Sequence, residues 1–113
     1  MGLSWAYAPD PSTAATTAEA VFDKLVASGA TFIDTAWIYG FVPGIPHSEE
    51  VIGAALRKHG RDAFQISEKI GVDIRKQPPF VQSADELRGQ LEESLARLGT
   101  TYVDILFLNR CVQ

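Results

Sequence analysis

Apolar residues recur at helical spacing in three segments of the chain, and each segment carries signals for its ends. The first segment predicts a helix from about Thr13 or Thr17 to Ser28. The second follows Ser48, a suitable N-cap, and the third follows the capping box that begins at Ser83. A glycine that can end a helix follows each segment, at Gly29, Gly60 and Gly99.

Three short apolar segments follow these helices and predict strands, at residues 31–35, 64–69 and 102–109. In the second strand Phe64 and Ile66 fall on one face, and polar residues fall on the other. The third strand is almost continuously apolar, which is typical of a parallel strand buried on both faces. Residues 1–11 predict a loop with the stub of a strand. The strict alternation of helix and strand therefore predicts βα units around a parallel sheet.

Composition and charge narrow the class of protein. With 113 residues, 46% of them hydrophobic and 21% charged, we expect one globular domain over residues 1–113. The net charge of -4 provides no basic surface for nucleic acid or anionic lipid, and no segment has the apolar length of a membrane helix. No signal peptide is evident, and the single cysteine, Cys111, excludes an internal disulfide, so we expect a cytoplasmic protein.

Each predicted strand ends on or near a polar residue: Asp34, Lys69 and Asn109. The carboxyl ends of parallel strands meet at one edge of a sheet, so these side chains are expected to point into one mouth. Tyr39 lies in the loop after the first strand and can fold over the same place. An ammonium group stabilises a nearby phenolate, and a carboxylate can hold the ammonium, so this set predicts a proton donor for a carbonyl oxygen. The hydride for such a reduction has to come from a cofactor.

Other polar residues are expected to have structural roles. Glu49 and Glu50 are interpreted as charges at a helix start, and His47 as a capping or solvated residue rather than a ligand. No spacing of Cys, His or carboxylate residues predicts a metal site. Glu68 is expected on the strand face opposite the terminal lysine, with no role assigned. Trp37 could form a wall of a substrate pocket or pack in the interior, and the sequence leaves both open.

Several motifs resemble the signature of the aldo-keto reductases. They are Gly29-Ala30-Thr31-Phe32-Ile33-Asp34-Thr35-Ala36, Tyr39-Gly40, Ser48-Glu49-Glu50 with Ile52-Gly53 and Ala55-Leu56, Ser67-Glu68-Lys69, and Tyr102-Val103-Asp104 after the helix that Gly99 ends. The resemblance covers nearly the whole chain. It implies an α/β fold that forms part of a (β/α)8 TIM barrel, roughly the first four βα units with a truncated first strand. It also implies NADPH-dependent reduction of aldehydes and ketones.

The resemblance implies roles for individual residues. Tyr39 would be the general acid, Lys69 the partner that lowers the pKa of its phenol, and Asp34 the support of Lys69 and of the nicotinamide ribose. Gly2 and Leu3 resemble the segment that lies along the NADP(H) cofactor in this family.

Two departures from the family pattern keep a second function open. Asn109 stands where the family has a histidine, and its amide can donate a hydrogen bond to a carbonyl but cannot carry a proton. A full barrel takes about 250 residues, and this chain ends after what would be the fourth strand. The hypotheses are therefore a reductase of small-molecule carbonyls and a non-catalytic remnant or interaction module with the same architecture. The open edge of the last strand predicts self-association. A doubly wound binding domain is disfavoured, because no glycine-rich phosphate loop follows a strand.

Overall fold

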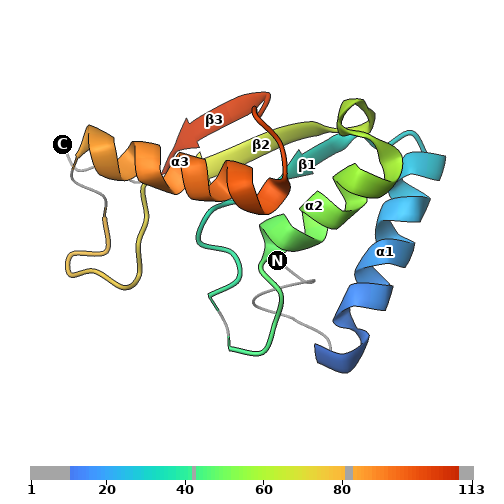
Figure 1. The fold of residues 1–113 in the computed structure, drawn as a ribbon, viewed down its shortest axis with the longest axis horizontal. Coiled ribbons are helices and arrows are strands. Elements are labelled where there is room, and N and C mark those ends of the chain that lie inside the picture. The colour runs from blue at the N-terminus through green and yellow to red at the C-terminus, as the bar shows by residue number, and fades with distance from the viewer. Residues whose placement is uncertain (1–10, 42, 81–82, 110–113) are drawn as a thin grey trace.

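The computed structural model describes residues 11–41, 43–80 and 83–109, in which helices and strands alternate as the sequence predicts. In chain order the elements are α1 (Pro11–Ala27), β1 (Phe32–Asp34), α2 (Ser48–His59), a 3-10 helix (Arg61–Ala63), β2 (Gln65–Ile70), α3 (Ala84–Leu98) and β3 (Ile105–Leu108). Figure 1 shows α2 and α3 lying across one face of the strands, with α1 beside α2. The predicted strand stub at the N-terminus lies outside the described residues.

The sheet consists of three parallel strands in the order β1-β2-β3. Asp34 of β1 pairs with Ser67 of β2, and Lys69 of β2 pairs with Phe107 of β3. The carboxyl ends of all three strands therefore lie at the same end of the sheet. The predicted α/β fold with βα units is confirmed to this extent, as three strands and three α-helices.

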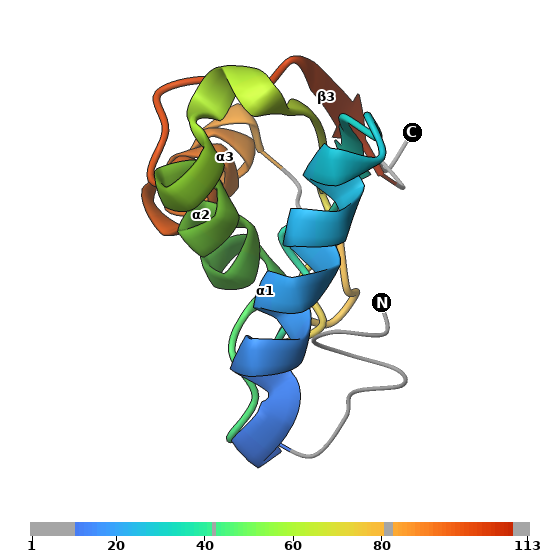
Figure 2. The same cartoon turned by 90° about the vertical axis from the view of Figure 1, so that its right-hand side faces the viewer.

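The hydrophobic core lies between β2 and the helices that cover it, on the side that Figure 2 shows facing α2 and α3. Ile66 of β2 and Leu98 of α3 are both 0% exposed. Phe22 of α1 meets Phe64 edge to face, with ring centroids 6.0 Å apart. Ile52, Ala55 and Leu56 of α2 complete the cluster. Ile66 therefore faces the helices, as its place in the alternating pattern predicts.

The N-cap of α2 is His47, where the sequence predicted Ser48. His47 Nδ1 accepts a hydrogen bond from the backbone N–H of Glu49 (3.3 Å), and the Glu50 carboxylate accepts one from the N–H of His47 (3.1 Å). A ring nitrogen can satisfy an N–H at a helix start as a hydroxyl oxygen does. The Ser48 hydroxyl instead donates to the carbonyl of Tyr39 (2.9 Å) and so fixes the preceding loop.

The other helix ends follow the predicted signals more closely. Ser83 Oγ accepts from the N–H of Glu86 (3.2 Å), which confirms Ser83 as the N-cap of α3, one half of the predicted capping box. Gly99 ends that helix in the left-handed conformation with φ of 67°. α1 begins at Pro11, before the predicted threonines, because proline is favoured in a first helical turn. In the described ranges, no helix combines the length and the apolar content needed to cross a membrane.

β3 departs most from its prediction. Its four residues are exposed, from 40% at Ile105 to 57% at Leu108. In the described sheet β3 has β2 as its neighbour on one side, so the prediction of a buried strand is wrong and the apolar segment forms an open edge. The strand is shorter than predicted because Asp104 Oδ2 accepts from the N–H of Ile66 (2.7 Å), which puts a side chain where a strand carbonyl would otherwise bind.

Candidate active site at the ends of β1 and β2

Asp34 and Lys69 form an ion pair across the ends of two neighbouring strands. Lys69 Nζ lies 2.5 Å from Asp34 Oδ2, and Ser67 Oγ donates to Asp34 Oδ1 at 3.0 Å. The parallel register explains both contacts, because it places Asp34 opposite Ser67, and Lys69 projects from the same face two residues later. The Asp34 side chain is 55% exposed and that of Lys69 is 19% exposed, so the pair borders the uncovered face of the sheet.

Tyr39 lies over the same ammonium group. Lys69 Nζ is 5.5 Å from the centroid of the Tyr39 ring, within the range of a cation–π contact. The backbone of Tyr39 is held in a turn, in which its N–H donates to the carbonyl of Ala36 (2.9 Å) and its own carbonyl accepts from the N–H of Ser48 (3.0 Å). The structure therefore brings together three of the predicted residues, namely Asp34, Tyr39 and Lys69. A carboxylate, an ammonium and a phenol in this order can hold and release a proton.

Asn109, the fourth predicted residue, directly follows β3. Its N–H donates to the carbonyl of Ile70 (2.7 Å). Its carbonyl oxygen packs so close to Gly71 that a Cβ there would approach to 2.8 Å, and Gly71 also has φ of +111°. Glycine is therefore required at position 71, where the ends of β2 and β3 approach closely. The predicted cofactor-binding residues Gly2 and Leu3 lie outside the described residues.

A second polar cluster lies on the helix-covered face of the sheet. Glu49 stands in the first turn of α2, as predicted, but it is 0% exposed and pairs with Arg97 of α3. His47 Nδ1 lies 3.3 Å from the same carboxylate, and burial of the ring lowers the pKa of His47. Glu68 of β2 is also 0% exposed. Its burial, together with the charge of Glu49, raises the pKa of Glu68 to about 9.

The sequence pattern contained part of the signal for this cluster. Alternation along β2 places Glu68 on the face of Ile66, and so against the helices, as expected. Arg97, the partner on α3, carries no such signal, because one arginine in a helical segment does not reveal which face of that helix meets its neighbour.

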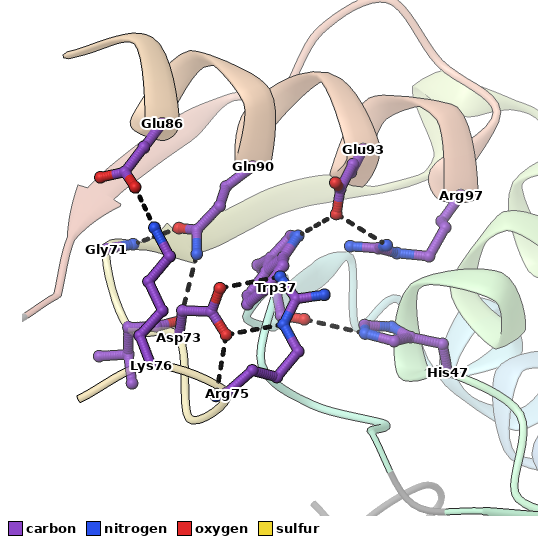
Figure 3. Close-up of polar contacts among 11 residues, drawn as sticks. Trp37, His47, Gly71, Asp73, Arg75, Lys76, Glu86, Gln90, Glu93 and Arg97 are labelled. Carbon is purple, nitrogen blue, oxygen red and sulfur yellow. Dashed lines mark hydrogen bonds and ion pairs between the residues drawn. The ribbon is translucent and has the colours of Figure 1, made fainter. Parts of the chain in front are cut away.

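Trp37, in the loop after β1, packs against helix α3 (Figure 3). Its side chain is 1% exposed, and its indole Nε1 donates to Glu93 Oε2 at 2.8 Å. The guanidinium of Arg75 covers the ring, 4.8 Å from its centroid. Of the two roles that the sequence left open, the structure supports interior packing.

Other possible sites are few in the described part of the chain. Within it, no group of three or more His, Cys, Asp or Glu residues is arranged to hold a metal ion. A cavity of about 460 Å³ opens between α1 and α2, with Phe22, Val51 and Ala55 in its lining and Glu19 and Lys58 among its charged residues. Of the predicted site residues that the structure describes, Asp34, Tyr39, Lys69 and Asn109, none lines this cavity.

Asp34 has the properties needed to bind a hydroxyl group of a cofactor. Each of its oxygens already accepts one hydrogen bond, from Ser67 and from Lys69 respectively. A carboxylate offers about four acceptor positions, and more than half of the side chain remains exposed. Asp34 can therefore accept a further hydrogen bond from the open side of the sheet.

Comparisons with known proteins agree on one family. The model of the Aldo/keto reductase family matches residues 1–112. The chain is 34% identical over 111 residues to an aldo-keto reductase of Gibberella moniliformis, and 35% identical over 107 residues to the aldo-keto reductase YhdN of Bacillus subtilis. It is 36% identical over 110 residues to the 6-dehydroglucose reductase of Novosphingobium aromaticivorans. These matches cover 97%, 92% and 94% of this chain, and 32%, 29% and 35% of the three relatives.

A solved structure gives the same result for the fold. The chain resembles PA4992 of Pseudomonas aeruginosa, assigned as an aldo-keto reductase, with a TM-score of 0.68 and 29% sequence identity. The match covers 94% of this chain and 38% of that protein. The chain therefore spans about a third of the length of the relatives that it matches.

Proposed function

The chain belongs to the aldo/keto reductase family, and from this premise we propose that it is part of an oxidoreductase that reduces small-molecule aldehydes or ketones with NADPH. The three-stranded sheet is then the beginning of a (β/α)8 barrel, continued by further strands at the edge of β3. The observation that supports this function best is the contact of Asp34, Lys69 and Tyr39 at the carboxyl ends of parallel strands, where barrel enzymes have their active sites.

Each residue of the site has a distinct task in this proposal. Tyr39 donates its hydroxyl proton to the substrate oxygen as negative charge develops there. The ammonium of Lys69, 5.5 Å from the ring centroid, stabilises the phenolate that remains. Asp34 holds that ammonium in place through the 2.5 Å ion pair. Asn109 donates an amide hydrogen bond that orients the carbonyl, without transferring a proton.

The cofactor supplies the hydride that reduces the carbonyl carbon. Asp34 suits a contact with the nicotinamide ribose, because its exposed carboxylate can accept a further hydrogen bond beside Lys69. Gly2 and Leu3 are proposed to lie along the cofactor. The other contacts with its phosphates would come from the part of the family's fold that this chain does not span.

Turnover of NADPH with a reactive aldehyde, such as 4-nitrobenzaldehyde, tests the proposal through the absorbance of the cofactor. We expect Tyr39→Phe to lower the rate by about 10²- to 10⁴-fold, the usual contribution of a general acid. Tyr102→Phe is the matched control, because Tyr102 is 46% exposed and lies beneath Arg61, 4.0 Å from the ring centroid to Cζ. Equal rates for the wild type and Tyr39→Phe would exclude the general-acid role.

A second function, as an interaction module, is favoured by the exposure of β3. The side chains of Ile105–Leu108 are 40% to 57% exposed, and one edge of the strand has no neighbour in the described fold. Such an edge offers unpaired backbone groups and apolar side chains to another strand. A wild-type chain that forms stable assemblies but does not oxidise NADPH would support this function over the reductase.

A further inference from the structure

Trp37 lies two residues before Tyr39 and connects three segments of the fold (Figure 3). Its backbone N–H donates to the carbonyl of Lys69 on β2 (3.0 Å), and its indole N–H donates to Glu93 on α3 (2.8 Å). Its carbonyl accepts from Nε2 of His47 at the start of α2 (2.8 Å). Nε2 of His47 carries the proton because Nδ1 accepts the capping hydrogen bond of that helix.

The indole ring is also covered by side chains of both loops that flank the site. The Phe41 ring lies 4.7 Å from it, centroid to centroid, and the Arg75 guanidinium lies 4.8 Å from its centroid. Asp73 binds Arg75 through two hydrogen bonds of 2.8 Å and is itself 4% exposed. A turn of the Trp37 ring would therefore displace the side chains of Phe41 and Arg75, one from each loop.

The position of Trp37 bears directly on Tyr39. The two residues share a tight turn, in which the N–H of Tyr39 donates to the carbonyl of Ala36. Two planar peptide units separate them, so a shift of one is passed to the other. Lys69 contacts both residues: its carbonyl accepts a hydrogen bond from the backbone N–H of Trp37, and its ammonium lies over the ring of Tyr39.

We propose that Trp37 is a positioning residue that keeps the Tyr39 ring against the Lys69 ammonium, and that Glu93 of α3 fixes Trp37 in this role. Trp37 acts through Tyr39. The consequence for catalysis rests on the proposed reductase function, whereas the geometric part of the proposal does not.

Three variants of α3 in the full chain test the geometric part by NMR. Glu93→Ala removes the acceptor for the indole N–H, whereas Glu93→Gln keeps an amide oxygen that can replace it. Glu92→Ala is the matched control, because it removes an exposed carboxylate from the adjacent position. We expect Glu93→Ala to shift the indole N–H signal of Trp37 and to abolish the through-space contacts between the ring of Tyr39 and the side chain of Lys69. We expect Glu93→Gln and Glu92→Ala to retain these contacts.

Two outcomes would overturn the proposal. In the first, the indole signal shifts in Glu93→Ala while the contacts between Tyr39 and Lys69 stay unchanged. In the second, Glu93→Gln loses those contacts as completely as Glu93→Ala does.

Steady-state kinetics extend the test to catalysis. We expect Glu93→Ala to lower kcat by about 10- to 100-fold with little change in KM, because a small misplacement of a catalytic group slows the chemical step. If the contacts respond as expected but the wild type does not turn over NADPH, the reductase function fails and the positioning role of Trp37 stands.

Discussion

The carboxyl groups of Glu68 in β2 and Glu49 in α2 lie within hydrogen-bonding reach of each other, although neither side chain is exposed to solvent. Two carboxylates cannot both be ionised at this separation without strong repulsion. Arg97 balances the charge of Glu49, while neither oxygen of Glu68 meets an N–H or hydroxyl donor in the described part of the chain. We therefore expect Glu68 to be protonated and to donate its own proton to Glu49.

The folded state is expected to lose stability as the pH rises, because the pKa of Glu68 is raised in it. In the folded chain its pKa is about 9, whereas an unfolded chain releases the proton near 4.5. The stabilising contribution is therefore present in full below pH 4.5 and is lost as the pH rises through about 9, with folding taking up about one proton between these values. The charged groups that act on Glu68 are Glu49 of α2 and, from the next position on its own strand, Lys69, whose charge opposes the rise in pKa.

Urea denaturation at a series of pH values measures this effect. Glu68→Gln should flatten the decline of the midpoint with pH, because a neutral amide has no proton to lose. Glu92→Gln, on the exposed side of α3, should leave the decline as it is in the wild type. An unchanged slope in Glu68→Gln would contradict the prediction.

Arg97→Met is expected to destabilise the fold by about 3–5 kcal/mol, because it leaves the carboxylate of Glu49 buried without its partner. The free energy of unfolding can be measured by chemical denaturation. Arg88→Met is the control on the same helix, since Arg88 and Asp85 form an ion pair with side chains 68% and 93% exposed. That change should alter stability by about 0.5 kcal/mol or less. A similar loss in the free energy of unfolding in both variants would show that the buried pair stabilises the fold no more than the exposed one.

Two helical glycines are expected to respond to alanine in opposite directions. At Gly53 of α2 a Cβ would lie 2.6 Å from the carbonyl oxygen of Arg97 and 3.0 Å from that of Leu98, so Gly53→Ala has to push α2 and α3 apart. We expect a loss of about 1–3 kcal/mol. At Gly89 of α3 a Cβ would meet nothing within 4 Å, and Gly89→Ala should gain up to about 1 kcal/mol from helix propensity. Thermal denaturation of both variants would reveal the sign of each change.

The chain is expected to self-associate through β3. Leu106 is 43% exposed on the open edge strand, and Leu106→Lys places a charge where another strand would pair. Light scattering should show a fall in mean mass for this variant. Ile74→Lys is the control, because Ile74 is 52% exposed but lies in the loop after β2. A wild-type chain that is monomeric at high concentration would refute the prediction.

Much of the fold could be predicted because its signals are local. Helical spacing and glycine ends located the three helices, and alternation in β2 placed Ile66 toward the core. The ion pair of Asp34 and Lys69 could also be anticipated, since the ends of neighbouring parallel strands converge.

The remaining features depend on which segments meet, and the sequence alone does not say this. His47 caps α2 because its ring fits between the helix start and the carbonyl of Trp37, a contact with no sequence pattern. The apolar segment of β3 predicts burial on both faces, but burial requires a neighbour that the described sheet lacks. The sequence shows that Glu49 lies at a helix start, but its burial depends on the contact with α3.

The β1–α2–β2 unit has a consequence for how the molecule forms. Asp34 and Lys69 are 35 positions apart, and Tyr39 lies between them. One helical crossover brings their two strands into pairing. This pairing involves no residue after β2, so it does not depend on β3. During synthesis, Asp34, Tyr39 and Lys69 can therefore come together before β3 has left the ribosome, in line with the folding of N-terminal segments first. Any later strands would then add to a site whose central ion pair already exists.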